Sequence, residues 1–159
     1  MAEAVIIEIT GVADRGTSTE ITYAVANRAA APIWLVNDPW FVWHRKNADA
    51  EISFARGRMK EGVHPFGYFP PETEEIPPGG RREKQFTLNW PQRLSRLWNH
   101  AEIAERPKGR FRLSVRIGYG LAPEPDPPKL GEEVEDPVLR WQKEAVSPPL
   151  EIGGTTRPL

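Results

Sequence analysis

Hydrophobic and polar residues alternate along much of this chain, and the alternation predicts strands that bury one face. Residues 4–12 show the pattern first, with apolar side chains on one face at Val5, Ile7 and Ile9. The polar, glycine-containing segment 14–18 predicts a turn. A second strand follows the turn, and its inward residues are Ile21, Tyr23 and Val25. We therefore expect an opening hairpin.

Further strands are predicted along the rest of the chain. Residues 33–36 are apolar on both faces, which is typical of a central strand. Prolines in the segment 62–80 allow at most a short edge strand there. The clearest alternation has inward residues at Phe111, Leu113, Val115 and Ile117. The remaining strands are expected at 40–45, 52–59, 81–90 and 139–152.

A different spacing predicts one short helix near residues 92–104. Its apolar residues recur at helical intervals, at Leu94, Leu97, Trp98 and Ala101. Seven to eight short strands with one helical connection predict an all-β fold, an antiparallel β-sandwich of two sheets. We expect a single domain over residues 1–153, followed by a frayed tail at 154–159.

Composition narrows the possible environment and partners. The 159 residues include 17 prolines and 13 glycines, which favours short strands joined by rigid loops. The absence of cysteine excludes disulfides, thiolate metal sites and cysteine nucleophiles. A formal net charge of −1 gives no general attraction to nucleic acid or to an anionic membrane. Residues 1–8 lack the features of a signal peptide, so we expect a cytoplasmic protein without a membrane span.

Several short motifs resemble those of one group of β-sandwiches. They are a strand with its closing asparagine turn, a proline–glycine turn, a strand entry and a closing strand, at residues 23–27, 76–80, 108–113 and 147–152. Together they resemble the immunoglobulin-like β-sandwich modules common in bacteria, including the fold of the intracellular proteinase inhibitor family. The resemblance implies an immunoglobulin-like sandwich, with Phe111 where such modules often place a corner tyrosine. It implies no functional residue, because these sandwiches carry many unrelated activities.

The sequence contains no recognisable catalytic, cofactor or metal motif. Residues 11–17 have the glycine spacing of a phosphate-binding loop, but the lysine is missing and a strand follows. His44, His64 and His100 do not lie at the close spacing of paired metal ligands. The serines lack the glycine-flanked context of a nucleophile elbow. We therefore expect a non-enzymatic protein without a cofactor or a metal.

Three arginines on one predicted strand are the first candidate binding site. Arg110, Arg112 and Arg116 alternate with inward apolar residues, so they point outward on one face. Such a row could dock an acidic partner protein through its guanidinium groups. The alternative is a solvent-facing strand whose arginines pair with carboxylates such as Glu83. Nucleic acid is not an expected partner, because no aromatic residues interleave with the arginines.

The loop 122–137 is the second candidate surface. It is proline-rich, strongly acidic and long for a connection in a compact domain. Its candidate partner-binding residues are Glu124, Asp126, Glu132 and Glu133. The alternative is a long loop that binds nothing.

Aromatic residues define the third candidate surface. Trp40, Phe41 and Trp43 straddle both faces of one strand, and the loop 65–70 adds Phe66 and Tyr68. An exposed aromatic platform could hold a sugar or a peptide. The alternative is that the segment 62–80 folds over the tryptophans.

Taken together, these patterns favour a non-enzymatic module that binds another protein through the loop 122–137 and the arginine-rich strand face. Protease inhibition and assembly into a multimer are specific forms of this hypothesis. The alternatives are a carbohydrate-binding sandwich with exposed aromatic residues and an enzyme whose site forms only in three dimensions.

Overall fold

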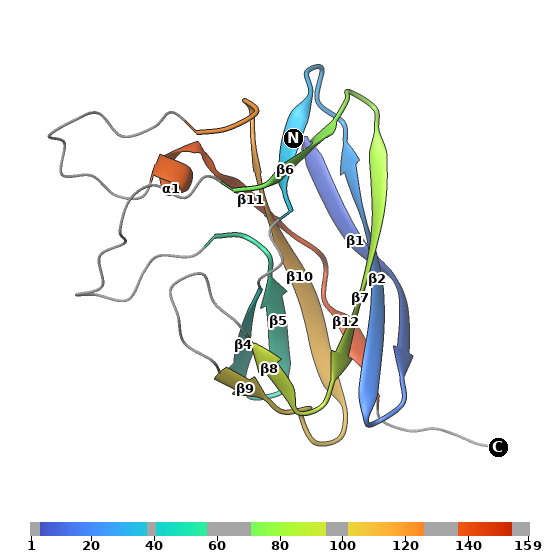
Figure 1. The fold of residues 1–159 in the computed structure, drawn as a ribbon. Helices are drawn as coiled ribbons and strands as arrows, with labels where there is room; N and C mark the ends of the chain where they lie inside the picture. Colours follow the sequence, from blue (N-terminus) through green and yellow to red (C-terminus); the bar gives the residue numbers. More distant parts are fainter. Residues whose placement is uncertain (1–3, 38–40, 57–70, 95–101, 126–136, 154–159) are drawn as a thin grey trace, which may run out of the picture.

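Two β-sheets packed face to face form the body of the molecule (Figure 1). The structure is a computed structural model that describes residues 4–37, 41–56, 71–94, 102–125 and 137–153. The predicted all-β sandwich is confirmed. No helix in these ranges is long and apolar enough to cross a membrane.

The smaller sheet contains three strands in the order β1-β2-β7. They are β1 (Val5–Asp14), β2 (Ser18–Asn27) and β7 (Arg81–Asn89). β1 and β2 are antiparallel, with a β-bulge between Ile9 and Gly11, so the predicted opening hairpin is confirmed. Gly16 closes the turn with a φ of 81°, a conformation that residues with a Cβ rarely adopt.

The larger sheet is built around β10 (Phe111–Gly120). Its strand order is β4-β5-β10-β3-β6, and β11 and β12 also pair with β10. The four predicted inward residues of β10 are at most 1% exposed, which confirms the strongest strand prediction. β3 lies between β10 and β6, as expected for a central strand, and β6 is the expected short edge strand. The other strands are β3 (Ile33–Val36), β4 (Val42–Lys46), β5 (Asp49–Ser53), β6 (Thr73–Ile76), β11 (Lys143–Val146) and β12 (Leu150–Ile152).

One strand pair departs from the predicted antiparallel arrangement. β5 pairs with β10 in parallel, from Asp49 beside Arg112 to Ser53 beside Arg116. The alternation of apolar and polar residues shows which face of a strand is buried, but it carries no information about the direction of the neighbouring strand. The parallel pair therefore had no signature in the pattern.

The predicted helix near residues 92–104 is wrong at both of its ends. The described ends of this segment are two antiparallel strands, β8 (Gln92–Leu94) and β9 (Glu102–Ala104), and the residues between them lie outside the described part of the chain. A few apolar residues at helical spacing are a weak signal, and pairing of the two strands satisfies the backbone groups instead. Within the described ranges the one helix is α1 (Pro137–Trp141).

The strand predicted at 139–152 is divided into α1, β11 and β12. Pro148 and Pro149 lie between β11 and β12, and proline has no N–H to donate to a sheet. The additional short strands β8, β9, β11 and β12 raise the number of strands above the predicted seven to eight. The predicted tail at 154–159 lies outside the described residues.

Aromatic rings join the two sheets in the core. Phe54 stacks on Tyr23 of the smaller sheet, with ring centroids 5.7 Å apart. It also meets Phe86 edge-on at 5.2 Å and Phe41 at 5.6 Å. Such offset and edge-on contacts add to the stabilisation from burial alone. The sandwich thus leaves one large face of the larger sheet, its outer face, to be filled by other parts of the chain or by solvent.

Candidate functional site

The outer face of the larger sheet is divided into two halves along β10. Alternate residues of β10 point to this face, at Arg112, Ser114, Arg116, Gly118 and Gly120. We define the upper outer face as the part over Gly118 and Gly120. We define the lower outer face as the part over Arg112, Ser114 and Arg116, with the adjoining strands β4, β5 and β11.

The chain itself covers the upper outer face. A Cβ atom at Gly120 would lie 1.8 Å from Cε2 of Trp141, and one at Gly118 would lie 2.2 Å from Oε1 of Gln142. Only glycine leaves room for these two side chains to lie flat on the strand. Trp141 is fixed there by its Nε1–H, which donates to the carbonyl oxygen of Ala122 at 3.0 Å.

Gln142 also ties the segment that follows β5 to this cover. Its Oε1 accepts the backbone N–H of Arg56, and its Nε2 donates to the backbone carbonyl of Arg56, both at 2.9 Å. A side-chain amide used in this way satisfies both the N–H and the carbonyl oxygen of the Arg56 backbone. The upper outer face is therefore occupied by the protein's own residues.

The lower outer face carries the predicted arginines, which are paired within the domain. Arg112 donates through Nε and Nη2 to the two carboxylate oxygens of Asp49 at 2.7 and 3.0 Å. Arg116 forms ion pairs with Glu51 at 3.1 Å and Glu144 at 3.5 Å. The hydrogen bond with Glu51 raises the pKa of Arg116 above its usual value.

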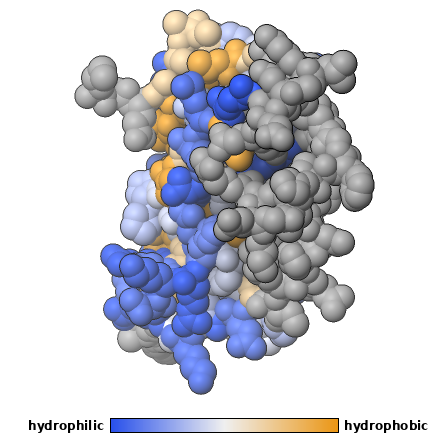
Figure 2. Space-filling model, turned by 90° about the vertical axis from the view of Figure 1, so that its left-hand side faces the viewer, coloured by the Kyte–Doolittle hydropathy of each residue, from blue (hydrophilic) through white to orange (hydrophobic). Residues whose placement is uncertain are grey.

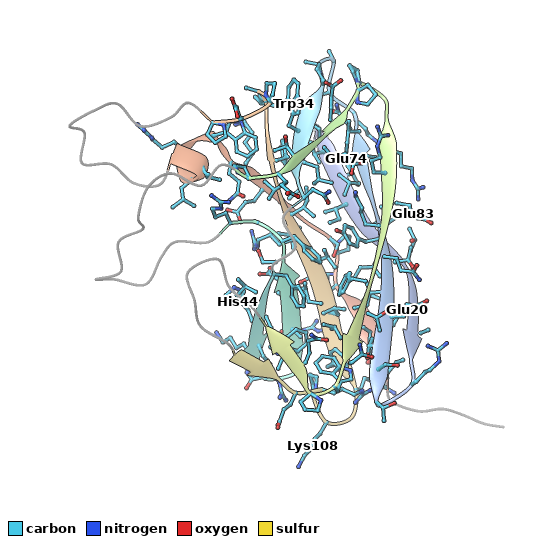
Figure 3. The ribbon with its side chains drawn as sticks, viewed as in Figure 1. Glu20, Trp34, His44, Glu74, Glu83 and Lys108 are labelled. Atoms are coloured by element: carbon cyan, nitrogen blue, oxygen red, sulfur yellow. The ribbon has the colours of Figure 1, made fainter. Side chains whose placement is uncertain are left out.

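Arg110 and Glu151 form a further ion pair at 3.1 Å, near the lower end of β10. The carboxylates thus come from β5, β11 and β12 rather than from Glu83. Glu83 pairs with Arg81 at 3.7 Å on the smaller sheet. Figure 3 shows Glu83 on one side of the sandwich and His44, which marks the lower outer face, on the other. The arginines are therefore not a bare basic stripe.

A groove of about 520 Å³ runs over the lower outer face. Its floor includes Glu51, Arg112 and Ser114. One wall is β4, with His44 and Lys46, and the opposite wall is formed by Val146, Ser147 and Pro149. Figure 2 views the side of the molecule on which β4 lies, and there hydrophilic residues gather in the lower part of the described surface. The groove is shallow, so its polar groups stay in contact with water.

A cluster at the lower end of the sandwich was not predicted from the sequence. The carboxylate of Asp14 accepts hydrogen bonds from Arg106 at 3.2 and 2.5 Å, and from the hydroxyl of Thr19 at 3.0 Å. Arg106 also donates to the carbonyl oxygen of Pro107 at 2.7 Å. The hydrogen bond from Arg106 is the main cause that lowers the pKa of Asp14. The two residues are far apart in sequence, so only the fold reveals a pair that fixes the turn before β10.

The predicted aromatic platform is not formed by the two described residues, Phe41 just before β4 and Trp43 within it. Phe41 packs in the core, and Trp43 lies edge-on against Trp90 with ring centroids 5.4 Å apart. Trp40, Phe66 and Tyr68 lie outside the described residues. No observation on the described surface therefore favours the carbohydrate-binding alternative.

The acidic loop is described only in part. Glu124 is exposed near its start, and Asp126, Glu132 and Glu133 lie outside the described residues. Within the described ranges, no group of three or more histidine, aspartate or glutamate side chains could hold a metal ion.

Comparison with known proteins gives no further assignment. No protein-family model, no curated protein and no solved structure matches the chain. The immunoglobulin-like resemblance thus remains a prediction from short motifs, and function has to be argued from the outer face itself.

Proposed function

We propose that this chain is a non-enzymatic binding module that recognises another protein through its lower outer face. The observation that carries the proposal is the groove of about 520 Å³ on the half of the outer face that the described chain leaves open. The other half is filled by Trp141 and Gln142. A sheet face of this kind, with satisfied polar groups beside an exposed apolar residue, has the mixed character of protein interfaces.

The shape of the groove supports binding rather than catalysis. Catalytic sites gain their strength from exclusion of water around a few polar groups, whereas this groove is open and its ion pairs are exposed. In Arg112 and Asp49, more than half of each side chain is exposed. Such groups can exchange their partners for those of an incoming protein at low cost.

The arginine-rich strand face predicted from the sequence is part of the proposed site, but its arginines are paired. Arg112 contributes to the floor of the groove as one half of an ion pair. The resemblance to immunoglobulin-like modules implies no functional residue, so the proposal rests on the groove and its lining. The proposed binding surface is the strand face, and the loop 122–137 begins beyond the opposite, upper end of β10.

The proposal is tested with a substitution that fills the groove and should therefore prevent binding of a partner. Ser114→Trp places a large ring on the floor of the groove, and Thr87→Trp places the same ring on the exposed face of β7. Both variants and the unchanged chain are used as bait in affinity capture from the native organism. We expect a stoichiometric partner that is retained by Thr87→Trp and lost with Ser114→Trp. Equal capture by both variants would remove the lower outer face as the site.

A further inference from the structure

The first wall of the groove carries polar groups that the described chain does not use. His44 and Lys46 lie two residues apart on the edge strand β4, and both are exposed. Neither forms an ion pair or a side-chain hydrogen bond with another described residue. The acidic residues nearby are already engaged, Asp49 by Arg112 and Glu51 by Arg116. The ammonium group of Lys46 lies opposite Asp49 on β5, but among the described residues it forms no ion pair, because Asp49 is engaged by Arg112.

The opposite wall is apolar and fixed in place. Val146 is 38% exposed, and Pro149 is exposed beside it. Ser147 between them turns away and accepts the backbone N–H of Val115 at 2.9 Å. Because its hydroxyl is used in this way, the wall presents methyl and ring carbons to the groove.

An extended peptide has the geometry to use both walls at once. Side chains of an extended chain point alternately to opposite sides, and those on one side repeat every 7 Å or so, which is also the spacing of His44 and Lys46 along β4. β5 and β10 lie between β4 and β11, so the two walls are three strand spacings apart, or about 14 Å. A chain lying along the groove can thus place one set of side chains on each wall. Its backbone then faces the polar floor at Ser114.

We propose that the groove binds an extended acidic segment of the partner protein, in which carboxylate side chains alternate with apolar ones. This inference rests on the proposed function. The carboxylates receive charge-assisted hydrogen bonds from Lys46 and His44, and the apolar side chains cover Val146 and Pro149. The charge of the β4 wall selects for acidic residues, and the period of two selects for their spacing.

The test uses the full chain and two labelled peptides of equal composition. Both contain five glutamates and five valines, either in alternation or as two blocks. Binding is measured by fluorescence anisotropy at about 0.15 M salt, where charges more than about 8 Å apart are largely screened. We expect the alternating peptide to bind about tenfold more tightly than the block peptide. Equal affinity for the two peptides would overturn the proposed alternation.

Two charge-reversal variants separate a local effect from net charge. Lys46→Glu is expected to weaken binding of the alternating peptide at least tenfold. Lys108→Glu makes the same change in net charge at a turn that points away from the body of the sandwich (Figure 3), and no change in affinity is expected. Equal losses in the two variants would show a general charge effect and contradict the proposal.

The outcomes also separate this inference from the proposed function. If Ser114→Trp abolishes capture of the native partner but neither peptide binds, the lower outer face remains the site and its proposed acidic ligand is wrong. If Ser114→Trp leaves capture intact, the proposed function itself fails.

Discussion

The two halves of the outer face lie over the same strand, but one is covered by the chain and the other is open. In the upper half, Gly118 and Gly120 leave a flat surface, and Trp141 and Gln142 lie directly on it. In the lower half, arginines at Arg112 and Arg116 project from β10, and the surface above them is an open groove. Alternate positions of one strand thus determine whether a sheet face is covered by the chain's own residues or left available for a partner.

The largest loss of stability is expected when the packing of Trp141 on the upper outer face is disrupted. In Gly120→Ala the new methyl group overlaps Trp141, so the helix α1 has to move, and a loss of about 3 kcal/mol in the free energy of unfolding is expected. Gly11→Ala is the matched control, because its Cβ would come no closer than 3.8 Å to Thr22. Urea denaturation of both variants provides the measurement. Equal stability of the two would show that Trp141 does not pack closely on β10.

Burial of an ion pair provides the next comparison. The side chains of Asp14 and Arg106 are 15% and 19% exposed, against 56% and 59% for Asp49 and Arg112. Asp14→Asn is therefore expected to lower the free energy of unfolding by about 2 kcal/mol at pH 7, and Asp49→Asn by less than about 1 kcal/mol. Urea denaturation measures both, and similar losses would contradict the comparison.

The effect of Asp14→Asn on the free energy of unfolding is expected to depend on pH. The pKa of Asp14 is lowered in the folded protein from 3.8, chiefly by its hydrogen bond with Arg106. Its contribution to stability is thus fully present above pH 3.8 and is lost as the pH falls through the lowered value. The stability difference between the unchanged chain and Asp14→Asn should shrink over this acid range. A difference independent of pH would show that the carboxylate charge is not responsible.

A smaller effect is expected from Gln142→Ala, which removes two hydrogen bonds to the backbone of Arg56. The loss in the free energy of unfolding should be about 1.5 kcal/mol, and amide exchange at Arg56 should become faster. Gln85→Ala, at an exposed position of β7, serves as the control. Unchanged exchange at Arg56 would mean that the amide of Gln142 does not hold the cover.

The smallest change in stability is expected from a substitution on the lower outer face. Arg112→Ala should change the free energy of unfolding by less than about 1 kcal/mol, because its ion pair with Asp49 is exposed to solvent and screened by salt. A double-mutant cycle with Asp49→Ala measures the coupling. A coupling well above about 1 kcal/mol would show that these charges support the fold and are less free to serve a partner.

Much of the fold could be predicted because it depends on a local property, the period of two. The strand with Phe111, Leu113 and the residues that follow was predicted from this alternation, and its burial agrees. The helix predicted near 92–104 was wrong at both ends, because a few apolar residues in a short segment fit more than one period. The parallel pairing of β5 with β10 has no local signal at all.

The candidate site was predictable only in part. The outward direction of Arg112 and Arg116 follows from the alternation, but their partners depend on which strands are neighbours. Glu83 was a reasonable partner from the sequence, and it lies on the other sheet. The cover of Gly120 by Trp141 joins residues about 20 positions apart, and no spacing rule connects a glycine in a strand with a distant tryptophan.

The parallel pair also imposes an order of events on a chain that emerges from a ribosome. Asp49 and its partner Arg112 are separated by 63 residues, so β5 has no neighbour on its inner edge until that length has been made. At the usual rates of synthesis this takes about 3 to 13 s, far longer than a hairpin needs to form. During this interval β4 and β5 present an unpaired edge and the apolar side chains of Trp43 and Ile52. The open edge of the β4–β5 hairpin is consequently a site at which newly made chains can aggregate during this interval.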